Sequence, residues 1–127
     1  LSAWERAATE DIITETDALP PTERLARLIT TVFAEHPLND AIESAIREWA
    51  ATAPPVQARI AVIDARRLAY VEGLLRDLGQ PEDVARMRAG VMYRALIGEF
   101  TWRRQGGEAL SAAALQQVYE MVTAPWA

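Results

Sequence analysis

The chain has 127 residues, enough for one domain with a hydrophobic core of its own. It contains no cysteine, which excludes disulfides and thiolate zinc sites and fits a reducing cytoplasm. Its net charge is −5 and its basic residues are scattered arginines, so it lacks the basic patch that nucleic-acid binding requires. It also lacks a run of about 18 apolar residues. We therefore expect a single cytoplasmic domain over residues 1–127 that spans no membrane.

Proline and glycine divide the chain into about six segments, each with apolar residues at helical rather than alternating spacing. The first three helices are expected at about residues 2–16, 21–35 and 40–53. Asp40 followed by Glu43 is a capping-box pattern, which predicts that the third helix begins there. Because no segment shows the alternation of a strand, the sequence predicts an all-α fold, a bundle of about six helices.

The last three helices are expected at about residues 55–78, 81–102 and 111–122, with the Ser111 hydroxyl capping the sixth. The fourth is the longest and carries Arg67 on an otherwise apolar stripe. The fifth is apolar nearly all the way round, and such a helix in a soluble protein must be buried on more than one side. In so small a domain, this pattern predicts a partner chain on one of its faces.

The fifth and sixth helices are expected to form a hairpin with an apolar stripe that the single chain does not need. Two such hairpins related by a twofold axis would form a four-helix dimer interface. The alternative is that the stripe packs on the first four helices of the same chain. The candidate interface residues are Leu96, Phe100, Arg103, Leu115, Val118, Tyr119 and Val122.

Enzyme motifs are missing from the sequence. The single histidine, His36, precedes Pro37 and is expected in a loop or the last turn of a helix, without the serine partner of a catalytic triad. No glycine-rich phosphate loop and no Glu-x-x-His metal pair occurs. We therefore predict no catalytic residue, no metal and no cofactor.

A ligand pocket is the remaining possibility, and Arg67 is its strongest marker. An arginine on an inward stripe needs carboxylate or carbonyl partners, or else a ligand. The alternative is a structural ion pair, or a guanidinium stacked on a tryptophan. Tyr93 is a further aromatic candidate for a pocket wall. The candidate pocket residues are Ile12, Leu28, Val32, Trp49, Ile63, Arg67, Tyr70, Met87 and Val91.

In this order and spacing, the segments resemble the C-terminal effector-binding and dimerisation domain of the TetR/AcrR family of bacterial transcriptional regulators. Leu1 to Ala7, with Trp4, is similar to the fourth helix of that family. The later segments resemble its fifth to ninth helices in turn: residues 22–28, 45–51, 64–79, 81–98 and 111–122.

The resemblance implies dimerisation through the last two helices and a pocket bounded mainly by the family's fourth, fifth, seventh and eighth helices. Effector binding would shift the first helix of this chain and so change operator affinity. The helix-turn-helix unit that would precede Leu1 is not in the sequence, so DNA binding is expected only of a full-length parent. The expected function is sensing of an unknown, largely apolar effector by a homodimer. The alternatives are a helical interaction module without a small-molecule site, and a small helical enzyme that uses Arg67.

Overall fold

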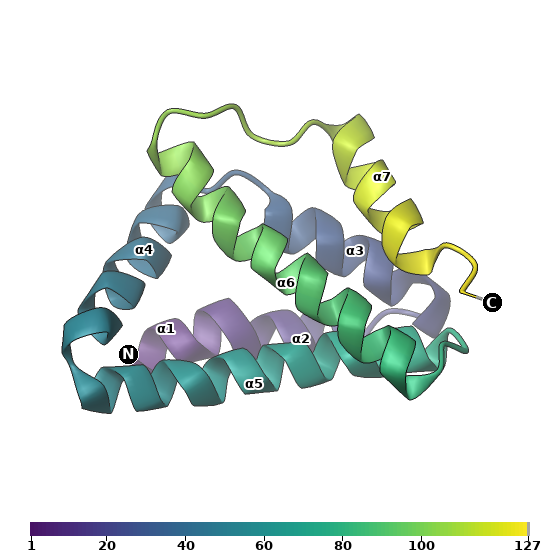
Figure 1. The fold of residues 1–127 in the computed structure, drawn as a ribbon, viewed down its shortest axis with the longest axis horizontal. Coiled ribbons are helices and arrows are strands. Elements are labelled where there is room, and N and C mark those ends of the chain that lie inside the picture. Colours follow the sequence, from purple (N-terminus) through teal and green to yellow (C-terminus); the bar gives the residue numbers. More distant parts are fainter. Residues whose placement is uncertain (127) are drawn as a thin grey trace.

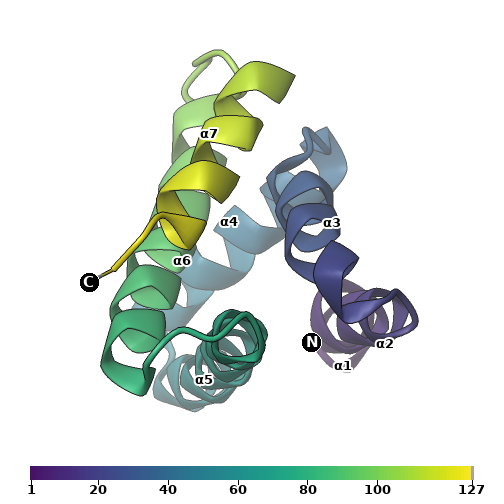
Figure 2. The same ribbon diagram turned by 90° about the vertical axis from the view of Figure 1, so that its right-hand side faces the viewer.

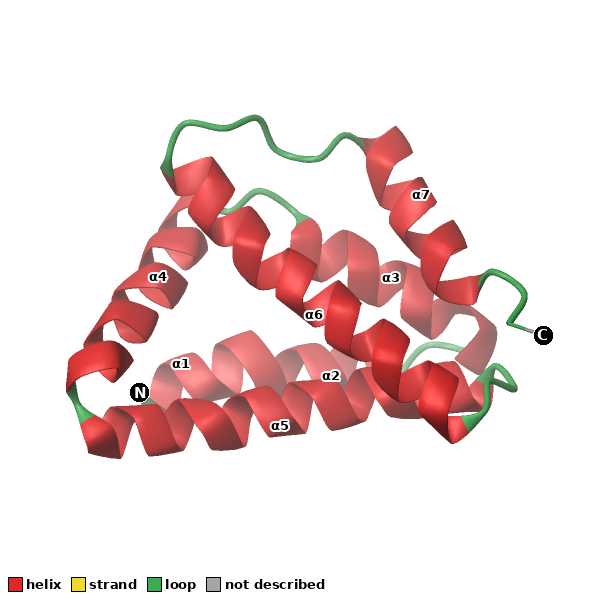
Figure 3. Ribbon diagram, viewed as in Figure 1, coloured by secondary structure: helices red, strands yellow, loops and turns green. Residues whose placement is uncertain are grey.

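The computed structural model describes residues 1–126, and within this range it contains helices and no strand (Figure 3). The prediction of an all-α fold with six helical segments is confirmed. The first segment is continuous but has a π-helical stretch in its middle. The bounds are α1 (Ser2–Glu5), the π-helix η1 (Arg6–Glu10), α2 (Asp11–Asp17), α3 (Pro21–Phe33), α4 (Pro37–Thr52), α5 (Pro54–Asp77), α6 (Glu82–Arg104) and α7 (Ala112–Thr123).

Proline and glycine set most of the helix ends, as the sequence predicts. Proline occupies the first turn of α3, α4 and α5, where its missing N–H costs nothing. Gly79 and Gly106 adopt positive φ just after α5 and α6, a conformation that other residues rarely take. The Ser111 hydroxyl accepts a hydrogen bond from the backbone N–H of Ala114 at 3.1 Å, so the predicted cap of α7 is confirmed.

The predicted capping box at the start of the third helix is wrong. The helix α4 begins at Pro37, and the backbone N–H of Asp40 already donates to the carbonyl of His36 inside the first turn. The fixed φ of proline favours a helix start at that point. Asp40 and Glu43 are instead buried and ion-paired with arginines of other helices.

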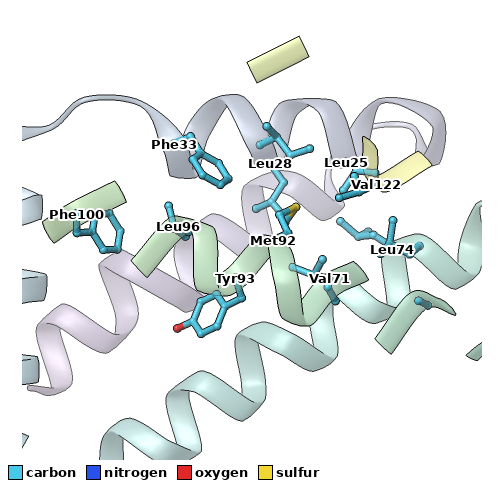
Figure 4. Packing of buried hydrophobic residues seen from close by; sticks show 14 residues of the cluster. Leu25, Leu28, Phe33, Val71, Leu74, Met92, Tyr93, Leu96, Phe100 and Val122 are labelled. Carbon is cyan, nitrogen blue, oxygen red and sulfur yellow. The ribbon is translucent and has the colours of Figure 1, made fainter. Parts of the chain in front are cut away.

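The long helices α5 and α6 form an antiparallel hairpin, and α4 crosses one end of it (Figure 1). The segment from α1 to α2 runs alongside α5, while α7 packs on α3 and α6 (Figure 2). The main core lies between α3, α5, α6 and α7 (Figure 4). Its most completely buried large side chains are Phe33, Ile29 and Leu75. A second cluster, built on Ile60 and Ile63 of α5, is covered by Leu1 and Trp4.

In the single chain, the predicted interface residues on α6 and at the end of α7 are buried and do not lie on its surface. Leu96, Phe100 and Val122 belong to the buried core, and the Arg103 side chain is also buried. Leu115, Val118 and Tyr119 are half-buried and pack against the same core. The helix α6 has two apolar faces, and α3 and α7 of the same chain cover the face that the sequence predicts for a partner chain.

Candidate ligand-binding cavity

A cavity of about 480 Å³ lies between the first helical segment and helices α3 to α6. This volume is within the range of about 300–1,000 Å³ that is typical of small-molecule sites. The cavity wall is mostly apolar. Leu28 of α3 and Met92 and Leu96 of α6, which are among the labelled core residues of Figure 4, also line the cavity. Its main apolar lining residues are Ile12, Ile13, Leu28, Val32, Leu38, Ile42, Val71, Met92, Leu96 and Phe100.

Five of the predicted pocket residues line this cavity: Ile12, Leu28, Val32, Arg67 and Tyr70. Tyr93 lines it as well. His36 is at its exposed rim, in the turn that precedes α4.

The other four predicted pocket residues lie elsewhere. Trp49 is exposed on α4, and Met87 and Val91 are 64% and 60% exposed on the outer face of α6. Ile63 is buried in the second cluster, against Trp4 and not against the cavity. Helical periodicity identifies an apolar stripe, but it does not tell which of two stripes on one helix faces a cavity.

At one end of the cavity, Arg67 contacts side chains of several different helices. Its Nε donates to the Thr9 hydroxyl at 2.9 Å, and its Nη1 donates to Glu43 Oε1 and to the Tyr93 hydroxyl, each at 3.1 Å. Its guanidinium lies over the Trp4 ring, 5.2 Å from the centroid. Both structural roles that the sequence suggested, an ion pair and a stacked guanidinium, are therefore present, and the same side chain also lines the cavity.

A second ion pair completes this polar network. Arg47 donates from Nη2 to Asp64 Oδ1 at 2.9 Å and to the Tyr93 hydroxyl at 3.2 Å, and it also forms an ion pair with Glu43. The Tyr93 hydroxyl donates its own proton to Asp64 Oδ1 at 2.5 Å. The network of Glu43, Arg47, Asp64, Arg67 and Tyr93 thus contains two positive and two negative side chains, whose charges balance.

The two arginines of this network stay charged and Tyr93 stays neutral over the ordinary pH range. Burial alone would lower the pKa of Arg47, but the hydrogen bond and charge of Asp64 raise it above its ordinary value. Burial also opposes the charge of Arg67, and the pKa of Arg67 is nevertheless raised by Glu43 and Tyr93. Burial, reinforced by the hydrogen bond to Asp64, raises the pKa of Tyr93 to about 12 although the charge of Arg67 opposes this shift.

Tyr93→Phe is expected to lower the free energy of unfolding at neutral pH by about 1.5–3 kcal/mol, because a hydrogen bond to a charged partner is lost. The folded state holds the Tyr93 proton more tightly than the unfolded chain, whose pKa is about 10. This contribution is therefore present below about pH 10 and lost as the pH rises to about 12. Urea titrations of both proteins should show their difference shrinking over that range, and a constant difference would contradict the assignment.

Side chains of α5 tie the first helical segment to the rest of the domain. Arg59 pairs with Glu5, Arg66 pairs with Glu10 at 3.1 Å, and the Tyr70 hydroxyl donates to Asp17 at 2.6 Å. On this side, the cavity wall is formed by residues 7–9 of the π-helix η1 together with Ile12 and Ile13 of α2. A π-helical turn is rare and is often found at functional sites.

A separate buried network lies beside Phe100, which lines the cavity. Arg103 donates from Nη1 to the carbonyl of Phe33 at 2.8 Å and from Nη2 to Asp40 Oδ1 at 2.9 Å. Glu99 is 3.8 Å from the same guanidinium and accepts from the backbone N–H of Leu110 at 3.1 Å. This network joins the ends of α3 and α6 to the start of α4 and holds the α6–α7 connection.

Comparison with family models, with curated proteins and with solved structures finds no match to this chain. Among residues 1–126, no helix is long and apolar enough to cross a membrane. In the same range, no group of three or more His, Asp or Glu side chains is placed to hold a metal ion.

Proposed function

We propose that this chain is the small-molecule-sensing and dimerisation domain of a TetR-like bacterial regulator. The observation that carries the proposal is the cavity of about 480 Å³, apolar along its walls and polar at the end that Arg67 occupies. A helical interaction module without a small-molecule site is expected to fill this space with its own side chains, because native protein cores are close-packed. An enzyme that uses Arg67 is less well supported, since Glu43 already pairs with that guanidinium.

The position of the cavity supports a sensing role. The η1 turn forms one wall, and Arg67 reaches from the cavity to Thr9 and Trp4 of the same segment. The resemblance implies that a DNA-binding unit precedes Leu1 in the parent protein. A ligand that displaces η1 would move the segment leading to that unit, and such a coupling between two sites is what allosteric regulation requires.

Dimerisation is proposed through the exposed face of α6. Met87, Val91 and Trp102 are exposed, and Ala95 and Gly98 lie between them at helical spacing. A Cβ at Gly98 would meet no other atom within 4 Å, so the middle of this stripe is open to a second helix. The face is an apolar surface of the kind that marks protein contacts, and the twofold packing of two such helices would cover it.

The sensing role is tested with naphthalene as an apolar probe. At ten times its Kd, naphthalene should add about 1.4 kcal/mol to the free energy of unfolding, which raises the melting temperature in a circular-dichroism scan. Val32→Trp should abolish this increase, because Val32 lines the cavity and the indole would fill it. Val62→Trp is the matched control, since Val62 is exposed on the outer side of α5. An equal increase in both variants would contradict binding in the cavity.

A further inference from the structure

One nitrogen of the cavity arginine is left without a partner. The Nε and Nη1 atoms of Arg67 donate to Thr9, Glu43 and Tyr93, whereas Nη2 has no hydrogen-bond partner among residues 1–126. Nη2 is not fully buried, and the Arg67 side chain is 12% exposed. Thr9, Glu43 and Tyr93 take the other two nitrogens, and the Trp4 ring covers one face of the guanidinium. Nη2 is therefore the nitrogen that Arg67 has available for the cavity that it lines.

The chemistry of this nitrogen restricts what can bind beside it. A guanidinium nitrogen carries only N–H donors, so the ligand group that meets Nη2 must be a hydrogen-bond acceptor. No other arginine is among the cavity-lining residues, and the chain has no lysine. The polar end of the cavity therefore offers one charged donor, set in an otherwise largely apolar wall.

The charge balance of the network determines whether the acceptor group of the ligand is neutral or a carboxylate. Arg47 and Arg67 are already matched by Glu43 and Asp64, and Tyr93 is neutral below about pH 12. His36 and Tyr70 are the remaining titratable groups of the lining. His36 is at the exposed rim, and burial together with the hydrogen bond to Asp17 raises the pKa of Tyr70 above its ordinary value, so that its hydroxyl stays neutral. A ligand carboxylate would bring a third negative charge next to Glu43, and a buried charge without a partner is strongly unfavourable.

We propose that the ligand of this cavity is a neutral, largely apolar molecule with a single acceptor oxygen, such as a ketone, ester or lactone carbonyl, that binds Arg67 Nη2. The inference rests on the proposed sensing function and adds the chemical class of the ligand. It excludes the carboxylate ligand that an arginine in an apolar cavity would ordinarily suggest.

Three naphthalenes test this inference by calorimetry at neutral pH: they carry an acetyl, an isopropenyl or a carboxylate group at the same ring carbon. The acetyl and isopropenyl groups have nearly the same shape and differ by an oxygen in place of a CH₂ group. The ketone should bind about tenfold or more tightly than the alkene, as expected for one hydrogen bond to a charged donor. The carboxylate should bind at least about tenfold more weakly than the ketone, because its charge has no partner.

A charge-balanced double variant tests whether Arg67 is the source of the preference for the ketone over the alkene. Arg67→Met combined with Glu43→Gln removes one charge of each sign and should reduce the ketone-to-alkene ratio to about one, because the Nη2 donor is gone. The matched control is Arg66→Met combined with Glu10→Gln, which removes an exposed ion pair between α5 and η1 and should keep the wild-type ratio. If the first double variant does not fold, the wild-type ratios alone decide.

Each result has a definite meaning. Equal affinity for the ketone and the alkene, or tightest binding of the carboxylate, would overturn the ligand class while leaving the cavity as a small-molecule site. Failure of all three compounds to bind would overturn the sensing function itself.

Discussion

Arg67→Met is expected to lower the free energy of unfolding by about 3–5 kcal/mol, the range for breaking a buried ion pair by removing one partner. The variant removes the closer ion-pair partner of Glu43, which is only 2% exposed and keeps Arg47 alone, and it also removes the hydrogen bonds to Thr9 and Tyr93. Urea denaturation followed by circular dichroism measures the loss.

Arg66→Met is the control for this variant because it removes the next arginine of the same helix. Its ion pair with Glu10 is about half exposed on both sides, and exposed pairs contribute about 0–1 kcal/mol. A loss for Arg67→Met no larger than that for Arg66→Met would show that the network does not stabilise the fold in the way described.

Val91→Glu is expected to weaken the proposed dimer by about a hundredfold or more, because it would place a charge of the same sign on each chain in the proposed contact between the two α6 helices. The fold should persist, since Val91 is mostly exposed in the single chain. Sedimentation velocity over the micromolar range measures the change. A monomeric wild-type protein at these concentrations would overturn the proposed dimer.

Phe100→Asp separates the two possible faces of α6. Phe100 is buried among core residues and its ring is 5.7 Å from the Arg103 guanidinium, so the substitution should unfold the domain. A folded but monomeric Phe100→Asp variant would instead favour the interface that the sequence predicted.

The sequence predicts the helices well because helix ends are set by the residues at those positions. Pro21 and Pro54 start helices, Gly79 and Gly106 follow helix ends, and Ser111 caps α7, each through its own backbone or side-chain chemistry. What each side of a helix packs against depends on the tertiary fold. Periodicity alone therefore could not assign the two apolar faces of α6.

The candidate site is only partly predictable for the same reason. Arg67 stands out because it interrupts an apolar stripe, but its partner Glu43 is 24 residues away and resembles a helix-capping residue in the sequence. The second arginine of the network, Arg47, is four residues after Glu43, and this i, i+4 spacing is the one local feature of the sequence that indicates its ion pair. Nothing in the sequence marks the π-helical turn that brings Thr9 to the guanidinium.

The most direct test of the central claim is to locate a bound probe by NMR. Nuclear Overhauser effects from the ring protons of acetylnaphthalene should reach the methyl groups of Ile12, Leu28 and Val32, which line the cavity on α2 and α3. Contacts limited to the exposed methyl groups of Met87 and Val91 would place the compound on the outer face of α6 and would contradict a ligand-sensing cavity.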